Sequence, residues 1–188
     1  TFTLELPPYR PPQIGRVIYT SIIDRTLFVL RRSIAVAIPA GIITWIFANI
    51  YIGDISLLTY VANFLDPLGK LIGLDGFILL AFILGFPANE IVIPIMIMAY
   101  MKTGVLTDTS NLLELKTLLI ENGWTIQTAI CFILFMLFHY PCSTTMLTIL
   151  KETKSFKWTF YAFLIPTIIG FILCVTVKFL FFFITTIA

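Results

Sequence analysis

Long apolar runs separated by short polar stretches dominate the chain. The first uncharged run covers residues 33–52, and its length suits a hydrocarbon core of about 30 Å. Two later runs, 77–101 and 124–150, are each interrupted by a proline-containing polar stretch, and a last run covers 158–182. This pattern predicts an all-α, polytopic transmembrane protein whose helices are in part broken or re-entrant.

Residues 1–32 precede the first apolar run and differ from it in character. Residues 1–12 end in a proline-rich stretch, which has few backbone N–H donors and is expected to be an extended linker. From Ile14 onward, apolar residues repeat at helical spacing between charged ones, which predicts an amphipathic helix in the membrane interface. We therefore divide the chain into a linker and juxtamembrane helix, 1–32, and a transmembrane gate domain, 33–188.

Shorter signals predict what lies between the apolar runs. Residues 53–76 mix short apolar pieces with charged residues, and we expect them to form an interfacial connection. Asn111, with Glu114 three residues later, is typical of a helix N-terminus, and Asn122 followed by Gly123 is a stop signal. A short amphipathic helix is therefore expected between these two signals.

Composition supports a membrane protein and excludes some other classes. Hydrophobic residues make up 59% and charged residues 12% of the 188 residues, and the mean hydropathy is +1.01. A soluble domain carries roughly twice that charged fraction. The net charge of +2 is too small to indicate nucleic-acid binding. Because the chain begins with Thr1 and ends in an uncharged apolar stretch, we expect it to be one part of a longer polypeptide.

Positive charge is concentrated at two places and predicts an orientation. Arginines cluster in the N-terminal flank and lysines in the loop 151–157, and such residues favour the cytoplasmic side. If all three intervening runs crossed the membrane, the two flanks would lie on opposite faces. The conflict disappears if the segment 77–101 enters and leaves on one face. We therefore expect a cytoplasmic N-terminus and a re-entrant segment.

The two interruptions form the candidate transport pathway. A proline inside a spanning helix frees backbone polar groups, and these are costly at membrane depth unless protein, water or a substrate uses them. Transporters place ion and substrate sites at such half-helix ends. The candidate pathway residues all lie in one interruption or the other: Gly85, Pro87, Asn89, Glu90, Pro141, Cys142, Ser143 and Thr144.

Glu90 and Cys142 are the candidate metal ligands. An acidic group at membrane depth costs at least about 2.5 kcal/mol, so Glu90 is expected to pair with a cation, a proton or a helix terminus. Its alternative role is to cap the helix that Pro87 opens. A cysteine at the start of a half-helix is placed to bind a divalent metal as the thiolate. The alternative for Cys142 is a small residue that permits close helix packing.

The other residues of metal-binding type have plainer alternatives. Met98 and Met101 follow the first interruption, and they are either soft ligands or flexible apolar filler. His139 is the single histidine, and it is either a ligand or a hydrogen-bonded structural residue. Cys131 and Cys174 lie inside apolar runs and are expected to be buried thiols.

The residues at the interruptions resemble a known family. The segments 85–94 (GFPANEIVIP), 139–145 (HYPCSTT) and 5–12 (ELPPYRPP) are similar to ferrous iron transport protein B. The resemblance implies the second, C-terminal gate half of a bacterial inner-membrane permease that carries Fe²⁺. It also implies a functional cysteine at Cys142 and a place beside the path for Glu90.

The resemblance implies partners as well. They are a GTP-binding domain and a first gate half of the same protein, and a small cytoplasmic accessory protein. Membrane lipid is expected as a partner from the composition, and association of two copies stays open because the sequence holds one gate half. The sequence has no G-x-x-x-x-G-K-[ST] phosphate loop, so no GTP site is expected in this chain. It also has no evident nucleophile–base pair, and enzymatic activity is not expected.

Two other function classes stay open at this point. The gate repeat also occurs in proteins named for nucleoside recognition, so a small-solute carrier would use Asn89 and Glu90 for hydrogen bonding. A purely structural membrane subunit would keep both interruptions packed and dry. Residue chemistry alone does not select iron, because a thiolate and a carboxylate serve several divalent metals. Replacing Cys142 with Ser separates metal transport from solute transport.

Overall fold

The computed structural model describes residues 14–53, 55–104 and 111–187. The proline-rich stretch 1–12, with the 5–12 similarity, lies outside the described residues. Contacts divide the chain into two units, Thr1–Ala35 and Val36–Ala188. The functional division between residues 32 and 33 stays a prediction.

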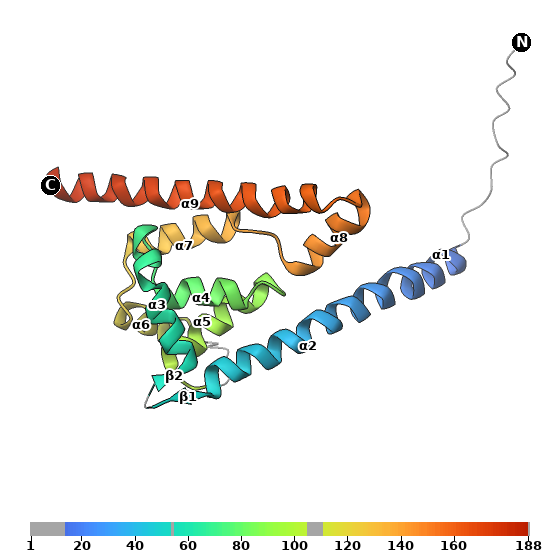
Figure 1. Ribbon diagram of the computed structural model, residues 1–188, viewed down its shortest axis with the longest axis horizontal. Helices are drawn as coiled ribbons and strands as arrows, with labels where there is room; N and C mark the ends of the chain where they lie inside the picture. Colours follow the sequence, from blue (N-terminus) through green and yellow to red (C-terminus); the bar gives the residue numbers. More distant parts are fainter. Residues whose placement is uncertain (1–13, 54, 105–110, 188) are drawn as a thin grey trace, which may run out of the picture. The chain divides into compact units, whose positions relative to one another are not determined.

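Residues 14–49 are helical throughout (Figure 1). Three elements make up this stretch: α1 (Ile14–Thr20), the π-helical η1 (Ser21–Leu27) and α2 (Phe28–Asn49). The part that is apolar and long enough to cross a membrane is Val29–Asn49, so the predicted span 33–52 is shifted toward the C-terminus. The shift arises because Arg31 and Arg32 do not interrupt the helix, although their charge suggested a boundary.

A short hairpin and a helix occupy the stretch predicted to be an interfacial connection. β1 (Tyr51–Ile52) pairs antiparallel with β2 (Ile55–Ser56), and α3 (Leu57–Leu71) follows. The hydroxyl of Ser56 accepts a 3.3 Å hydrogen bond from the N–H of Thr59 and caps α3. Two of the charged residues that suggested a polar connection, Asp66 and Lys70, lie one helical turn apart in α3. They form an ion pair at 2.5 Å.

The first interrupted segment forms a helical hairpin. α4 (Gly76–Leu84) leads through the interruption and the 3₁₀ turn η2 (Asn89–Ile91) into α5 (Val92–Met101). The prediction of a broken segment at 77–101 is thereby confirmed. The chain bends by 108° between α3 and α4, and a Cβ on Gly76 would lie 1.9 Å from the carbonyl oxygen of Ala62. Only glycine therefore permits this close bend.

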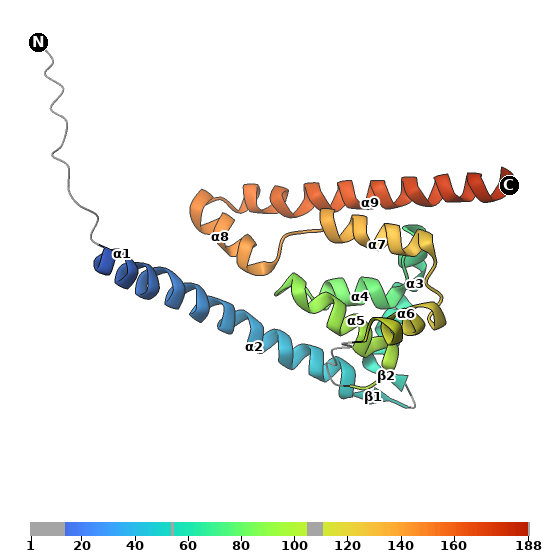
Figure 2. The ribbon, with the colours of Figure 1, turned by 180° about the vertical axis from the view of Figure 1, so that it is seen from behind.

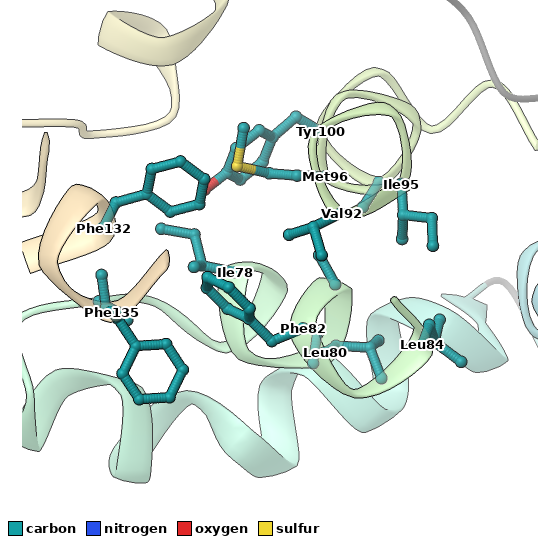
Figure 3. Packing of buried hydrophobic residues seen from close by; sticks show 14 of the residues in the cluster. Ile78, Leu80, Phe82, Leu84, Val92, Ile95, Met96, Tyr100, Phe132 and Phe135 are labelled. Carbon is teal, nitrogen blue, oxygen red and sulfur yellow. The ribbon is translucent and has the colours of Figure 1, made fainter. Parts of the chain in front are cut away.

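Side chains between α4, α5 and α7 form the centre of the buried core (Figure 3). The ring of Phe82 on α4 lies 5.7 Å from the ring of Phe132 and 4.8 Å from that of Phe135, both on α7. On α5, Val92 and Ile95 are almost completely buried. Short helices that are apolar all round are expected to be largely enclosed by other helices. Most residues of α4 and α5 are buried, and Ile83 and Ile93 are exposed.

The two ends of the α4–α5 hairpin lie together. The hydroxyl of Tyr100, at the end of α5, donates to Oδ2 of Asp75, which caps the start of α4. The same hydroxyl accepts a 2.8 Å hydrogen bond from Nε1 of Trp124. The rings of Phe77 and Tyr100 are 5.7 Å apart. Because Trp124 lies two residues before α7, both ends of the hairpin lie at the beginning of the next spanning segment.

The second half of the chain follows the predicted order. The remaining helices are α6 (Leu112–Glu121), α7 (Ile126–Phe138), α8 (Ser143–Thr153) and α9 (Phe156–Ile187). Asn111 caps α6 by accepting a 3.1 Å hydrogen bond from Leu113, as predicted. The predicted break in 124–150 is confirmed. The last span is confirmed too, and its helix α9 runs alongside α7 (Figure 1 and Figure 2).

Helix length and surface character identify a polytopic membrane protein. In the part of the chain that the structure describes, three helical segments are long and apolar enough to cross a membrane, and the bent pair α3–α4 would add a fourth. These segments expose large apolar side chains, among them Trp45 on α2 and Phe182 on α9. Lipid tails are as apolar as these side chains, so such exposure is costly in water but not in a bilayer.

Candidate pathway site at the two helix interruptions

The two interruptions are in direct contact. The backbone N–H of Ser143 donates a 2.8 Å hydrogen bond to the carbonyl of Phe86, and its Oγ lies 3.3 Å from the carbonyl oxygen of Pro87. The hydroxyl of Tyr140 donates a 2.5 Å hydrogen bond to the carbonyl of Phe82 in the last turns of α4. Backbone groups freed at one interruption therefore find their partners at the other.

Gly85 and Pro87 explain the shape of the first interruption. The N–H of Gly85 still bonds to the carbonyl of Ala81 at 2.8 Å, which closes the last turn of α4. A Cβ on Gly85 would lie 2.4 Å from Cγ2 of Val92, so only glycine lets α5 return this closely. Pro87 has no N–H to continue the helix, and the next residue, Ala88, is extended.

Pro141 explains the shape of the second interruption. α7 ends where His139 becomes extended, although its N–H still bonds to the carbonyl of Phe135 at 2.7 Å. The residue before a proline disfavours the helical conformation, so Tyr140 is not expected to continue α7. Cys142, with φ −59° and ψ 159°, then occupies the N-cap position of α8.

Cys142 gathers a small group of sulfur and oxygen donors. Its Sγ lies 3.1 Å from Oγ1 of Thr144 and 3.2 Å from Oγ1 of Thr145. The cysteine is half-buried and Thr145 is exposed. The sulfur therefore lies at the positive end of α8, close to hydroxyl groups that bind either a thiolate or a metal-bound species.

Aromatic rings fix the second interruption from two sides. The ring of Tyr140 stacks on Phe163 of α9, with centroids 4.9 Å apart and planes 17° apart. It also meets the ring of Phe86 edge-on at 5.5 Å. Tyr140 thus connects α9 with the tip of the α4–α5 hairpin, and the hydrogen bond of its hydroxyl group to Phe82 orients the ring.

Each interruption holds one buried acceptor without a partner. Among the residues that the structure describes, Oδ1 of Asn89 and Nε2 of His139 are the buried side-chain nitrogen and oxygen atoms that lack a hydrogen bond. Buried polar atoms are nearly always paired, and an unpaired one calls for an explanation. Both exceptions occur in the contact region of the two interruptions, where a ligand is expected.

Comparison with known proteins places both interruptions inside a domain of a known family. A family model described as "Gate: Nucleoside recognition" matches residues 30–156. The chain belongs to the Gate family. The matched range includes both interruptions and ends at the start of α9. No solved structure matches this Gate chain.

Several curated proteins are similar to the Gate chain. Over 161 residues it is 30% identical to the Fe(2+) transporter FeoB of Synechocystis sp., covering 84% of this chain and 25% of that protein. It is 27% identical to the Fe(2+) transporter FeoB of Staphylococcus aureus strain MSSA476, over 92% of this chain and 26% of that protein. The Fe(2+) transporter FeoB of Campylobacter jejuni is 24% identical, over 87% of this chain and 28% of that protein. The Gate chain thus spans about a quarter of the length of these relatives.

The predicted ligands of the Gate chain do not all meet. Glu90 is exposed, and within the described residues its carboxylate forms no hydrogen bond or ion pair. Met98 is buried and lines a cavity of about 260 Å³ beside the β1–β2 hairpin. Met101 lines a separate cavity of about 360 Å³ with α6. In the described ranges, no three or more His, Cys, Asp and Glu side chains are grouped as a metal site.

The residues predicted from the sequence for the site left out several that build it. Thr145 approaches the Cys142 sulfur as closely as Thr144 does, and its place in a run of hydroxyl residues after the cysteine was the available signal. Tyr140 was quoted only as part of a motif, yet it connects three elements. The Asp75–Tyr100 bond had one usable signal, an aspartate directly before an apolar helical run.

Proposed function

We propose that this Gate chain is the C-terminal membrane part of a ferrous iron transporter and that the two docked interruptions line its Fe²⁺ path. The relatives from Synechocystis sp. and Staphylococcus aureus carry the name Fe(2+) transporter, and similarity to them extends through both interruptions. The path would contain the predicted residues Gly85, Pro87, Asn89, Glu90, Pro141, Cys142, Ser143 and Thr144.

The observation that carries this proposal is the donor group at Cys142. Fe²⁺ is of intermediate softness and accepts sulfur, nitrogen and oxygen ligands. The hydroxyl oxygens of Thr144 and Thr145 lie 3.1 Å and 3.2 Å from the sulfur of Cys142. A mixed set of few donors suits transient binding, because a transported ion has to leave again.

Helix ends supply the electrostatic setting of the path. The C-terminal end of α4 carries partial negative charge from its carbonyls, and it lies against the start of α8 through the Ser143–Phe86 bond. A cation is favoured beside the end of α4, and a thiolate is favoured at the start of α8. Asn89 would add its free oxygen, and the exposed Glu90 would attract cations toward the site.

The contacts of Ser143 would close the path when no ion passes. Two hydrogen bonds join Ser143 to the first interruption, and each contributes about 1 kcal/mol net. Such contacts are strong enough to hold a closed conformation and weak enough to open during a transport cycle. We therefore assign Ser143 to gating and Cys142 to ion binding.

We further propose a topology and a set of partners. The N-terminus would be cytoplasmic and the α4–α5 hairpin re-entrant, in a bacterial inner membrane. The hairpin geometry supports this, since its two ends meet Trp124 while its tip reaches only the break between α7 and α8. A first gate half, a GTP-binding domain, an accessory protein and a second copy would complete the system, with GTP chemistry outside this chain.

Anaerobic Fe²⁺ uptake by cells that carry the complete protein tests the proposal. Cys142→Ser and Glu90→Gln are compared with Cys131→Ser, which alters a buried thiol away from the site. We expect uptake to fall at least about tenfold for Cys142→Ser at equal expression, as for loss of about 1.4 kcal/mol of binding, and to stay near wild type for Cys131→Ser. Uridine uptake that is unaffected by Cys142→Ser, without any Fe²⁺ uptake, would instead support the solute carrier.

A further inference from the structure

His139 is an unusual residue for an apolar protein interior. Its side chain is 8% exposed and is surrounded by aromatic rings. The ring centroid of Phe82 lies 5.0 Å away, that of Tyr140 5.2 Å and that of Phe135 6.3 Å. Because Phe82 belongs to α4, the imidazole lies between α7 and the hairpin, at the first residue of the second interruption.

The hydrogen bonds of His139 identify its tautomer. Nδ1 lies 2.8 Å from the carbonyl oxygen of Met136. A carbonyl only accepts hydrogen bonds, so Nδ1 carries the proton and Nε2 of the neutral ring keeps its lone pair. That lone pair is buried and has no donor opposite it. An imidazole held by an Nδ1–H bond to a carbonyl, with Nε2 free, has the arrangement found in metal-ligating histidines.

A purely structural histidine would not need this arrangement. An aromatic ring would fill the same space against Phe82 and Tyr140, and it would bury no unpaired acceptor. The second unpaired buried acceptor, Oδ1 of Asn89, lies in the opposite interruption. Both atoms offer a lone pair and neither carries a proton, so a cation would satisfy both in the same way.

We propose that Nε2 of His139 is a ligand of the transported divalent cation, which it binds transiently as the ion passes the docked interruptions. This inference rests on the proposed function and deepens it by adding a nitrogen donor to the sulfur and oxygen donors of Cys142 and Asn89. A neutral imidazole adds no charge of its own, so the ion keeps its net positive charge at this step. Imidazole suits Fe²⁺ and neighbouring divalent metals better than Mg²⁺ or Ca²⁺, and it would help to select among cations.

Two substitutions separate a ligand from a packing residue. His139→Asn keeps an N–H near the position of Nδ1, where it can donate to Met136, and it removes Nε2. His139→Gln places an amide near the position of Nε2 and loses the bond to Met136. A structural role is therefore preserved best by Asn, whereas a ligand role is preserved best by Gln.

The test uses the complete purified protein without oxygen, with Co²⁺ and Mn²⁺ as probes. We expect His139→Asn to lower Co²⁺ affinity at least about tenfold, within the range known for changes around metal ligands, and Gln to lower it less. In pulsed EPR of bound Mn²⁺, we expect a ¹⁴N coupling in wild type that His139→Asn removes. Thermal unfolding without metal should be close to wild type for His139→Asn.

Three outcomes would overturn the inference. The first is that His139→Asn binds Co²⁺ as tightly as the wild type does. The second is that the ¹⁴N coupling survives this substitution. The third is that the wild-type protein itself shows no ¹⁴N coupling. Cys142→Ser distinguishes a failure of the His139 assignment from a failure of the proposed path. If it weakens Co²⁺ binding while His139→Asn does not, the assignment of His139 fails and the path at Cys142 stands. If neither variant weakens binding, the proposed path fails as well.

Discussion

The backbone N–H of Ser143 donates a 2.8 Å hydrogen bond to the carbonyl of Phe86, and this bond joins the two interrupted segments of the molecule. Neither group has a helical partner, because each belongs to a stretch where a proline has ended a helix. Each interruption therefore depends on the other for backbone hydrogen bonding. A substitution in one interruption is therefore expected to alter the structure of both.

Substitution of Ser143 by proline should loosen the docked interruptions without harming α8. Ser143 is the first helical residue after the N-cap, where proline is well tolerated, and Cys142 already has the extended conformation that precedes proline. Ser143→Pro removes both bonds to the hairpin and leaves a carbonyl unpaired, at a cost of about 1–3 kcal/mol, whereas Ser143→Ala should cost about 1 kcal/mol. Thermal unfolding of the purified protein measures this, and equal stability of the two variants would contradict it.

Gly85→Ala should disrupt the tip of the hairpin. The new Cβ would lie 2.4 Å from Cγ2 of Val92 and 2.8 Å from the carbonyl oxygen of Ala81, and overpacking of this kind typically costs about 1–3 kcal/mol. Adding Val92→Ala removes the first contact and should restore part of the stability. Gly41→Ala, which meets nothing within 4 Å in α2, is the control. If both glycine variants unfold at the same temperature, the close return of α5 is wrong.

Tyr100→Phe should weaken the base of the hairpin. The substitution leaves Oδ2 of Asp75 and Nε1 of Trp124 without their shared partner, and unpaired buried groups cost about 1–3 kcal/mol. Tyr60→Phe is a matched control, because Tyr60 is 61% exposed. Hydrogen exchange of α4 and α5 should increase in Tyr100→Phe alone, and unchanged exchange would show that the network contributes little.

The hairpin geometry makes a topological prediction. Single cysteines at Lys70 and Thr103, which flank the α4–α5 hairpin, should react with an impermeant thiol reagent from the same side of the membrane. A cysteine at Ser155, beyond the α7–α8 segment, should react from the other side. The measurement uses a background in which the native cysteines are replaced. Labelling of positions 70 and 103 from opposite sides would mean that the hairpin crosses the membrane.

Part of this architecture was predictable because it depends on local chemistry. Pro87 and Pro141 stand among polar residues, and both breaks could be located from this combination. Proline alone would not have been enough, because Pro39, Pro67 and Pro166 lie inside continuous helices. α3 was missed because Asp66 and Lys70 suggested a polar connection, although their spacing of four residues also fits one face of a helix. The site residues were predicted as two separate groups, one in each interruption, and the contact between the two groups was not predicted.

The rest depends on contacts between distant segments, which no local pattern encodes. Nothing near Ser143 in the sequence indicates that its partner is Phe86, or that Tyr140 stacks on Phe163. The exposure of Glu90 was not foreseen either, because a carboxylate inside an apolar run suggests burial, whereas the turn after Pro87 lets this side chain point outward. Tertiary packing decides these features.

Protection of Cys142 by Fe²⁺ is the most direct test of the claim that the docked interruptions line an ion path. The complete protein, with Cys131 and Cys174 replaced by serine, is treated anaerobically with a small water-soluble methanethiosulfonate reagent, and modification of Cys142 is followed over time. We predict that the reagent reaches Cys142 and that Fe²⁺ slows the reaction, whereas Mg²⁺ does not. A Cys142 that reacts at the same rate with and without Fe²⁺, or that never reacts, would contradict the account.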